Sequence, residues 1–506
     1  MSQVAVTQLI KSLSKAEKRN FKLSIKKQSG NKDYLDLFDI IDESLFLDTP
    51  SLKRLFGKLH PESSLDNTAR YLFKILTDSL VQSKIKEDNL FKLMHGYLRV
   101  SILQERSLQD ESFKELKKLQ QLAISSQHHF MEYLMCRMEL NYISEMNFTG
   151  FSEQAVVELQ MKNRELLKGL QNVNEHYSLY ELLKCRLVYT GKTLSEEGKA
   201  QLNDLLLTEL AIISGRLKNN LAAQKQHLLF QSFFLINIGD YTSALKTFSE
   251  LNRLFENNLS IWNHPPLDYL SSLDGILDTL RTVGYFEEMP FYINKMNQLA
   301  NQAYPEYFRF VAKKTIIIYE LAILIGTKKY TDAIQFIENI DPPLLHPQNM
   351  VDYEKQCELL FSIGLAYYRV KNFKKAHKYI NEIVLVGKLH YQSVIYKAAR
   401  LLAIIMHYEA KNIDYLDYEI RAYKRTFQNK GKLLKTEKII FKVVKLQPNL
   451  NTIIRNKSLL KKIVPDIINI EKDKFEMKLL KYFNFLHWLQ CKIEKTEDAF
   501  PMQPIK

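Results

Sequence analysis

The stretch LFSIGLAYYRVKNFKKAHKYINEI, from Leu360 to Ile383, contains two runs of residues whose apolar positions follow the helical period. The positions that share one face are Leu360, Ile363, Gly364 and Tyr367 in the first run and Phe373, Ala376, Ile380 and Ile383 in the second. Gly364 and Ala376 are small enough for two helices to cross closely. The stretch therefore predicts a pair of packed helices joined by a short turn.

The same pattern recurs along the chain, with a small or apolar residue three positions after the residue that begins each second helix. These residues are Ala244, Met289, Ala333, Ala376 and Leu416, and they stand 40 to 45 residues apart. The five copies cover about residues 226–427, which is two fifths of the chain. Because a unit of this size cannot bury its apolar faces alone, we expect neighbouring units to stack.

The copies resemble the tetratricopeptide repeat (TPR), whose consensus has a Leu-Gly pair and a tyrosine on its first helix, then an aromatic residue and an alanine on its second. The resemblance implies an all-α solenoid whose first helices line a concave groove. The chain departs from the family in three ways. The glycine of the first helix is present only as Gly364, the proline that ends the repeat is absent, and the spacing exceeds the family's period of about 34 residues. We therefore expect helix pairs with longer arms or extra turns.

The groove-lining positions of the family, carried onto this chain, give a wall that is mostly apolar and aromatic. They are Leu229, Phe233, Ile236, Asp274, Asp278, Arg281, Ile318, Ala322, Ile325, Phe361, Leu365, Tyr368, Arg369, Leu401, Ile405 and Tyr408. Of these, we expect the partner-binding groove to use Phe233, Ile318, Phe361, Tyr368, Arg369 and Tyr408. A second interpretation is that the superhelix closes tightly, or that another segment of the chain fills the groove.

Length and composition favour a long helical array. A chain of 506 residues is too long for one compact core, and its 15 glycines and 13 prolines fall well below ordinary usage of about 7% and 5%. The expected regions are an N-terminal helical region at 1–105, degenerate helical repeats at 106–225, the TPR-like array at 226–427, a basic C-terminal helical region at 428–495 and a disordered tail at 496–506.

The N-terminal region begins with a recognisable helix start. Ser14 followed by Glu17, in SKAEKRNF, has the spacing of a capping box. The surrounding stretch LIKSLSKAEKRNFKL also resembles the start of a bacterial family of TPR-containing proteins. That resemblance is short and implies no particular activity.

The net charge of +14 is concentrated at the two ends of the chain. Residues 421–462 carry a net charge of +12 and residues 1–27 carry +6, so the remainder is slightly acidic. The segment KLLKTEKIIFKVVKL predicts a helix with a basic stripe formed by Lys435, Lys438, Lys442 and Lys445. Such a stripe is typical of a surface for nucleic acid, anionic lipid or an acidic protein, and equally of the solvent side of any packed helix.

No pattern in the sequence indicates catalysis, a metal or a cofactor. TGKT at 190–193 resembles the end of a phosphate-binding loop, but Arg186 stands where that loop needs a glycine. The four cysteines lie far apart without metal-binding spacing, which suits a reducing compartment. Since no apolar run is long enough to span a bilayer, we expect a cytoplasmic, non-enzymatic protein.

The sequence therefore predicts a scaffold for protein–protein interaction that binds a peptide or a helix in the groove of its array. The alternative is a nucleic-acid-associated regulator that contacts phosphates through the basic segment Arg421 to Lys462. The partner is a protein or peptide in the first case and an anionic molecule in the second.

Overall fold

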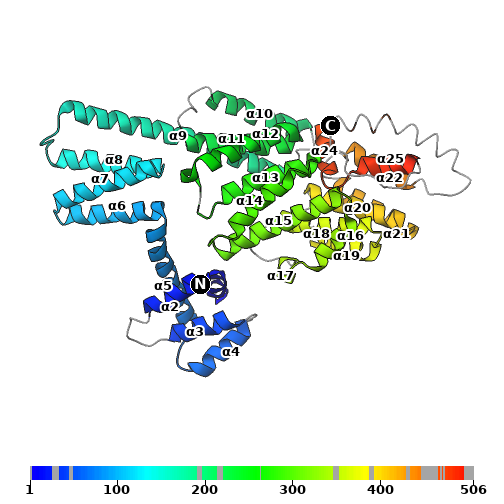
Figure 1. Cartoon of the computed structure of the whole chain (residues 1–506), viewed down its shortest axis with the longest axis horizontal. Helices are drawn as coiled ribbons and strands as arrows, with labels where there is room; N and C mark the ends of the chain where they lie inside the picture. Colours follow the sequence, from blue (N-terminus) through cyan, green and yellow to red (C-terminus); the bar gives the residue numbers. More distant parts are fainter. Residues whose placement is uncertain are drawn as a thin grey trace, which may run out of the picture. The chain divides into compact units, whose positions relative to one another are not determined.

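The chain folds into α-helices that follow one another in antiparallel pairs, as the computed structural model shows (Figure 1). The structure describes residues 3–25, 33–44, 49–190, 196–213, 220–262, 264–345, 353–386, 393–428, 433–445, 465, 467, 470 and 473–494. No β-strand occurs within these ranges. The all-α class predicted from the sequence is confirmed, whereas the tail predicted at 496–506 lies outside the described residues.

The chain divides into two compact units, which are described separately. The first unit comprises Met1–Gln171 with Ala303–Phe308, and the second comprises Asn172–Gln302 with Arg309–Lys506.

The first unit has two apolar cores. Helices α1 to α5 enclose the first core, and α6 to α8 enclose the second. The bounds are α1 Gln3–Ser12, α2 Lys15–Ile25, α3 Asp33–Glu43, α4 Thr49–Leu59, α5 Leu65–Glu87, α6 Asn89–Glu105, α7 Gln109–Ser125, α8 His129–Glu145 and α9 Glu153–Thr190, of which α9 continues into the second unit. The predicted capping box is confirmed: the Ser14 amide donates to Glu17 Oε2 at 2.7 Å, and the Glu17 amide donates to Ser14 Oγ at 3.2 Å.

The second unit contains the predicted helix pairs. After α10 (Glu196–Ile213) come α11 (Leu221–Ile238) with α12 (Tyr241–Asn257), α13 (Leu267–Val283) with α14 (Met289–Ala300), α15 (Glu306–Gly326) with α16 (Tyr330–Glu338), α18 (Tyr353–Arg369) with α19 (Phe373–Val386), and α20 (Val394–Glu409) with α21 (Ile413–Gln428). A 3-10 turn, η2 (Leu259–Ile261), and a one-turn helix, α17 (Pro342–Leu345), lie between pairs. The C-terminal helices are α22 (Lys435–Lys445), α24 (Lys474–Leu480) and α25 (Phe485–Glu494).

One turn geometry joins the two helices of each pair. A residue with positive φ follows each first helix: Gly239 at 81°, Gly284 at 83°, Lys328 at 64°, Lys371 at 58° and Lys411 at 58°. The next amide then donates back to the carbonyl five residues earlier, as Asn372 does to Tyr367 at 2.9 Å. This Schellman arrangement satisfies carbonyls at the helix end and reverses the chain. The turns of the first unit at Ser107 and Gln127 share it, each with φ of 59°.

The five residues that recur along the sequence, one in each helix pair, are all buried. Ala244, Met289, Ala333 and Ala376 have no exposed surface, and Leu416 is buried. A Cβ atom on Gly364 would lie 2.8 Å from the Ile380 side chain, so α18 and α19 approach too closely there for a larger residue. Gly364 thus allows the close packing of this pair.

Candidate protein-binding face

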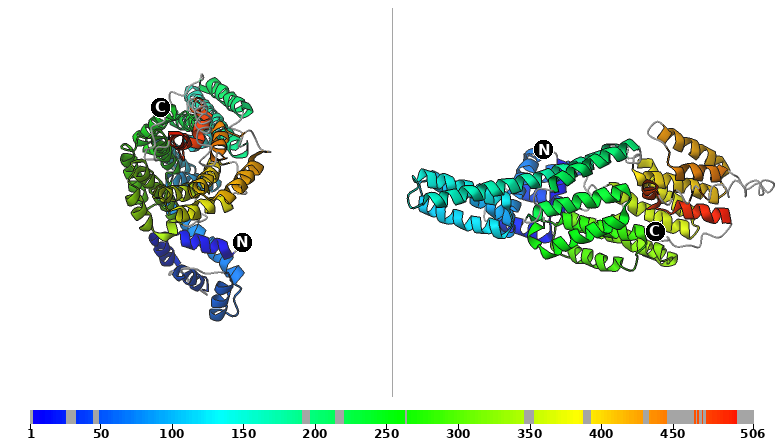
Figure 2. Two further views of the ribbon diagram at one scale, coloured as in Figure 1. Left: turned by 90° about the vertical axis from the view of Figure 1, so that its right-hand side faces the viewer. Right: turned by 90° about the horizontal axis from the view of Figure 1, so that it is seen from above.

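The C-terminal segment, residues 473–494, packs on the first helices of the array. Its helix α24 lies against α11 and α20, and Lys481, next in the chain, contacts α13. The left view of Figure 2 shows the red C-terminal helices among the green, yellow and orange helices of the second unit. The surface that receives them is named here the segment-binding face and consists of Asp278, Arg281, Glu358, Phe361, Tyr368, Arg369 and Tyr408.

Two consecutive aromatic residues of the segment pack against α18. The ring centroids of Tyr482 and Phe361 are 5.8 Å apart, and those of Phe483 and Tyr368 are 5.9 Å apart in an edge-to-face arrangement. The Arg369 guanidinium lies 5.3 Å from the Phe483 ring centroid. Such pairs add to the stabilisation that burial itself gives. Phe361 is only 2% exposed.

Trp488, on α25, anchors the segment to α20. Its ring lies 5.9 Å from that of Tyr408, and its Nε1 donates to Glu409 Oε1 at 2.9 Å. Lys492 forms an ion pair with the same carboxylate at 2.7 Å. Trp488 is fully buried, so its one polar atom needs this acceptor.

Lys481 completes a network of ion pairs on the face. Its Nζ lies 2.7 Å from Asp278 Oδ2, while Arg281 holds the other oxygen of Asp278 at 2.5 Å. Arg281 also lies 3.6 Å from Glu358, and Lys355 bridges Glu358 at 3.1 Å to Asp274 at 2.6 Å. The Tyr482 hydroxyl donates to Glu358 at 3.5 Å.

The pKa values of the network follow from this pairing. Burial alone would raise the pKa of the Asp278 carboxyl, but the positive charges of Lys481, Arg281 and Lys355 outweigh it and hold that pKa well below its ordinary value. The same opposition lowers the pKa of Glu358. Burial would lower the pKa of Lys481, yet Asp278 and its neighbours raise it well above the ordinary value. All three groups are therefore charged when the segment is docked.

Of the six residues expected to line the partner-binding groove, four contact the C-terminal segment, namely Phe361, Tyr368, Arg369 and Tyr408. The other two lie elsewhere. Phe233 packs between Tyr180 of α9 and Phe248 of α12, with centroid distances of 5.5 and 6.2 Å. Ile318 is fully buried in the core of the array. Helical periodicity places a residue on a face, but it does not show which neighbouring helix covers that face.

The sequence analysis did not predict that the C-terminal segment packs on this face. The segment LLKYFNFLHWL, residues 479–489, is rich in aromatic residues and holds one of the two tryptophans of the chain. That composition was the available signal, because a group of large aromatics near a basic region marks a packed segment.

The basic stripe on α22 faces solvent. Lys435, Lys438, Lys442 and Lys445 are exposed, while Ile439, Ile440, Phe441, Val443 and Val444 are buried. Lys435 lies 3.8 Å from Asp473, and the other three stripe lysines have no acid within ion-pair distance among the residues that the structure describes. Glu437 is fully buried and accepts a hydrogen bond from the Tyr423 hydroxyl at 2.7 Å, so it points away from the stripe.

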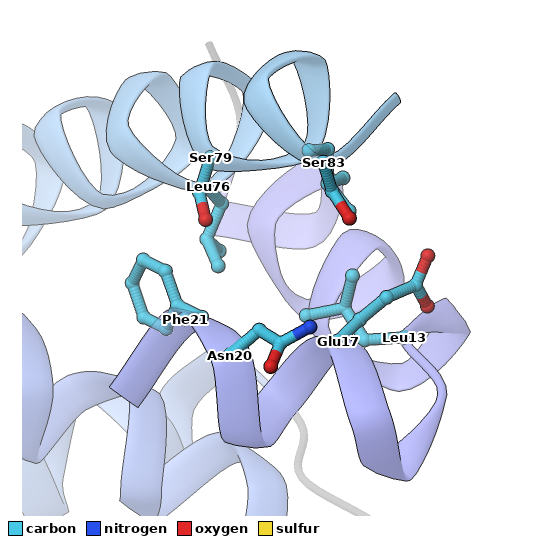
Figure 3. Close-up of a pocket in the computed structure, with 8 residues that line it drawn as sticks. Leu13, Glu17, Asn20, Phe21, Leu76, Ser79 and Ser83 are labelled. Atoms are coloured by element: carbon cyan, nitrogen blue, oxygen red, sulfur yellow. The ribbon is translucent and has the colours of Figure 1, made fainter. Parts of the chain in front are cut away.

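One small pocket lies in the first unit. A pocket between α2 and α5, lined by residues such as Phe21, Leu76 and Ser79, has a volume of about 20 Å³, room for about one water molecule (Figure 3). Within the residues that the structure describes, no group of His, Cys, Asp and Glu has the arrangement of a metal site, and no helix is long and apolar enough to cross a membrane.

Comparison with known proteins adds no relative: no protein-family model, no curated protein and no solved structure matches this chain.

Proposed function

We propose that the chain is a non-enzymatic scaffold for protein–protein interaction, built on an α-solenoid of TPR-like helix pairs whose concave face binds a polypeptide segment. The observation that carries the proposal is the occupation of the segment-binding face. Phe361, Tyr368, Arg369 and Tyr408 come from two successive first helices, and all four contact one stretch of polypeptide. First helices line the concave side in such solenoids, so this face has the composition and the geometry to hold a peptide.

The repeated turn supports the solenoid. In five pairs of the second unit, a residue with positive φ, either glycine or lysine, follows the first helix, and in four of them the second helix begins two residues later. Turns of similar geometry give the pairs a similar helix crossing, which is the condition for regular stacking.

A photo-crosslinking experiment in the native host tests the scaffold function. A photoreactive amino acid replaces Tyr368, on the segment-binding face, in a full-length chain that also carries Lys481→Glu to loosen the segment. A matched control places the same amino acid at the exposed Lys375 on α19. We expect one identified protein to crosslink at position 368, and an excess of peptide 474–494 to abolish it. Crosslinks only within the chain, or the same products from position 375, would refute the proposal.

The second candidate function, a nucleic-acid-associated regulator, is favoured by one specific observation. The exposed lysines of α22 form a stripe that its only acid, the buried Glu437, does not neutralise. Like charges in such a row repel one another, so an anionic partner would stabilise them.

Retention of the full chain on nucleic acid, heparin and anionic vesicles, measured over a range of salt, tests this candidate. Binding to duplex DNA should weaken with a logarithmic slope of about −0.9 per phosphate contacted. Changing Lys438, Lys442 and Lys445 to Gln should abolish that binding without loss of helix content, because the three side chains face solvent. Absence of salt-sensitive binding to all three supports would eliminate the candidate.

A further inference from the structure

Helix α6 of the first unit exposes a row of apolar side chains. Met94, Leu98 and Ile102 follow one another at intervals of four residues, and they are 50%, 59% and 55% exposed. This spacing places all three on one side of the helix, named here the outer face of α6. Single exposed leucines are ordinary on a protein surface, whereas a continuous apolar row on a helix is typical of a surface that another helix covers.

The opposite side of α6 is already buried. Leu93, Gly96 and Val100 lie about 160 to 220° around the helix from Leu98, counting 100° per residue, and all three are buried. A Cβ atom on Gly96 would collide with the Leu119 side chain, so α6 packs closely on α7. Helix α6 is therefore held in place from its inner side, and it is apolar on two opposite sides.

The place of α6 in the first unit leaves its outer face accessible. Helices α6, α7 and α8 pack in sequence around one core, and Figure 1 shows α5 running away from one end of α6. The end helix of such a stack ordinarily presents polar side chains outward, because no neighbour covers it. The outer face of α6 instead has the apolar composition of a face between helices.

Basic side chains border this face on one side. About 60 to 120° around the helix from the centre of the apolar row lie His95, Arg106, Arg99 and Lys92. Arg99 has Glu115 of α7 at 3.4 Å, whereas Lys92 and Arg106 have no acid within ion-pair distance in the part of the chain that the structure describes. The only acid of α6 itself is Glu105, its last residue. The border of the apolar row therefore carries a net positive charge.

This charge distinguishes between two kinds of helix that could cover the outer face of α6. If α6 from a second copy of the chain packed there in the antiparallel direction, the basic border of each copy would face that of the other, and like charges opposed across an interface are costly. A helix with acidic side chains beside its apolar row would match both the apolar surface and the charge.

We propose that the outer face of α6 binds an amphipathic helix of a partner protein, whose acidic side chains lie against Lys92, Arg99 and Arg106. This surface belongs to the first unit. The inference therefore does not depend on the segment-binding face, which belongs to the second.

Binding of a synthetic helix to the full-length chain, measured by fluorescence anisotropy, tests the inference. The probe is a labelled peptide of about 18 residues with leucines at helical spacing on one side and glutamates on both flanks of that side. A matched peptide carries lysine in place of each glutamate. We expect saturable binding of the acidic peptide. The lysine peptide should bind at least about tenfold more weakly, because its charges meet the basic border.

Two substitutions of equally exposed leucines show where the acidic peptide binds. Leu98→Ser should weaken its binding at least about tenfold, because the central apolar contact is lost. Leu59→Ser, on α4, changes a leucine that is 60% exposed and should leave binding unchanged. Undiminished binding to the Leu98→Ser chain, as expected if the peptide binds the lysines of α22 instead, would overturn the inference, and so would the absence of binding.

Sedimentation of the full-length chain without peptide tests the other occupant. We expect the unchanged chain and the Leu98→Ser chain to have the same oligomeric state. A dimer that Leu98→Ser dissociates would show that a second copy, and not an acidic helix, covers the outer face of α6.

Discussion

Ala376 and Gly364 set the distance at which α18 and α19 cross. Ala376 has no exposed surface, and a Cβ on Gly364 would also approach the Ala376 carbonyl oxygen at 3.4 Å. Lys375, the neighbour of Ala376 in the chain, has a side chain that is 52% exposed. The two adjacent positions therefore differ in environment while sharing the same helix.

Ala376→Glu should destabilise the array by about 3 kcal/mol or more, because it places an unpaired charge at a close helix crossing. Lys375→Glu should change stability by less than about 0.5 kcal/mol. Thermal unfolding followed by circular dichroism measures both. Similar melting temperatures for the two variants would contradict the packing of this pair.

Lys478 makes stability depend on pH in a defined direction. Its pKa is about 7 in the folded chain, below the ordinary value of 10.5, so the folded state favours the neutral amine. The unfolded chain binds the extra proton between pH 7 and 10.5, and this contribution to stability therefore rises with pH through that range and is absent below it.

Lys478→Met should remove this pH dependence, so the stability of the variant relative to the unchanged chain should fall as the pH rises from 7 toward 10. While the amine is neutral only in the folded state, the difference changes by about 1.4 kcal/mol per pH unit at most. Denaturant unfolding read by Trp488 emission at pH 7, 8 and 9 measures it. A stability difference that stays constant with pH would show that Lys478 is not buried as described.

The sequence allowed one side of the segment-binding face to be predicted at the residue level. Phe361, Tyr368 and Tyr408 were placed by carrying over the groove-lining positions of the repeat family that the chain resembles. Lys481 was out of reach, because its contact with Asp278 joins positions 203 residues apart and α24 is too short to show a helical period. Of the two interpretations stated for the groove, occupation by another segment is the one that the structure displays.

The helix–turn–helix pair is the element on which the array is built, and its turn depends on a left-handed residue. Glycine adopts positive φ without penalty, whereas a residue with a Cβ pays about 1–2 kcal/mol. Two first helices end with glycine at this position and three with lysine. Periodicity predicted the helices but not this turn, because the lysines carry none of the usual turn signals.

Gly239→Ala should destabilise the second unit by about 1 kcal/mol, since alanine must adopt a φ of 81° there. Lys371→Gly should have the opposite sign, by up to about 1 kcal/mol, because it relieves the strain at 58°. Melting temperatures of the two full-length variants check the pair. A gain from Gly239→Ala would rule out this account of the turn.

The charge pattern of α22 predicted which lysines are exposed, but it did not predict where the acid of the helix points. The sequence predicted its basic stripe, and the structure gives all four lysines the predicted exposure. The stripe had seemed to hold one neutralising acid, Glu437. In the fold that carboxylate is buried beside Tyr423 and Lys397, so it stabilises the interior instead.

At the scale of the whole molecule, the C-terminal segment packs against helices that lie far from it in the sequence. The last described residues, through Glu494, return to the helix array and complete its ion-pair network and its aromatic packing. Composition predicted a helical, basic C-terminal region. It did not predict that this region packs on the first helices of the array, because such packing depends on tertiary contacts.

A double-mutant cycle on Asp278 and Lys481 tests most directly whether the C-terminal segment packs on these helices. The full-length Trp262→Phe chain is compared with Asp278→Asn, Lys481→Met and the double variant, each unfolded in denaturant while Trp488 emission is followed. Because the two side chains form a buried ion pair at 2.7 Å, we predict a coupling energy of about 1–3 kcal/mol, with the second substitution costing far less once the first is present. Additive effects, with coupling near zero, would contradict the docking of the C-terminal segment on the array.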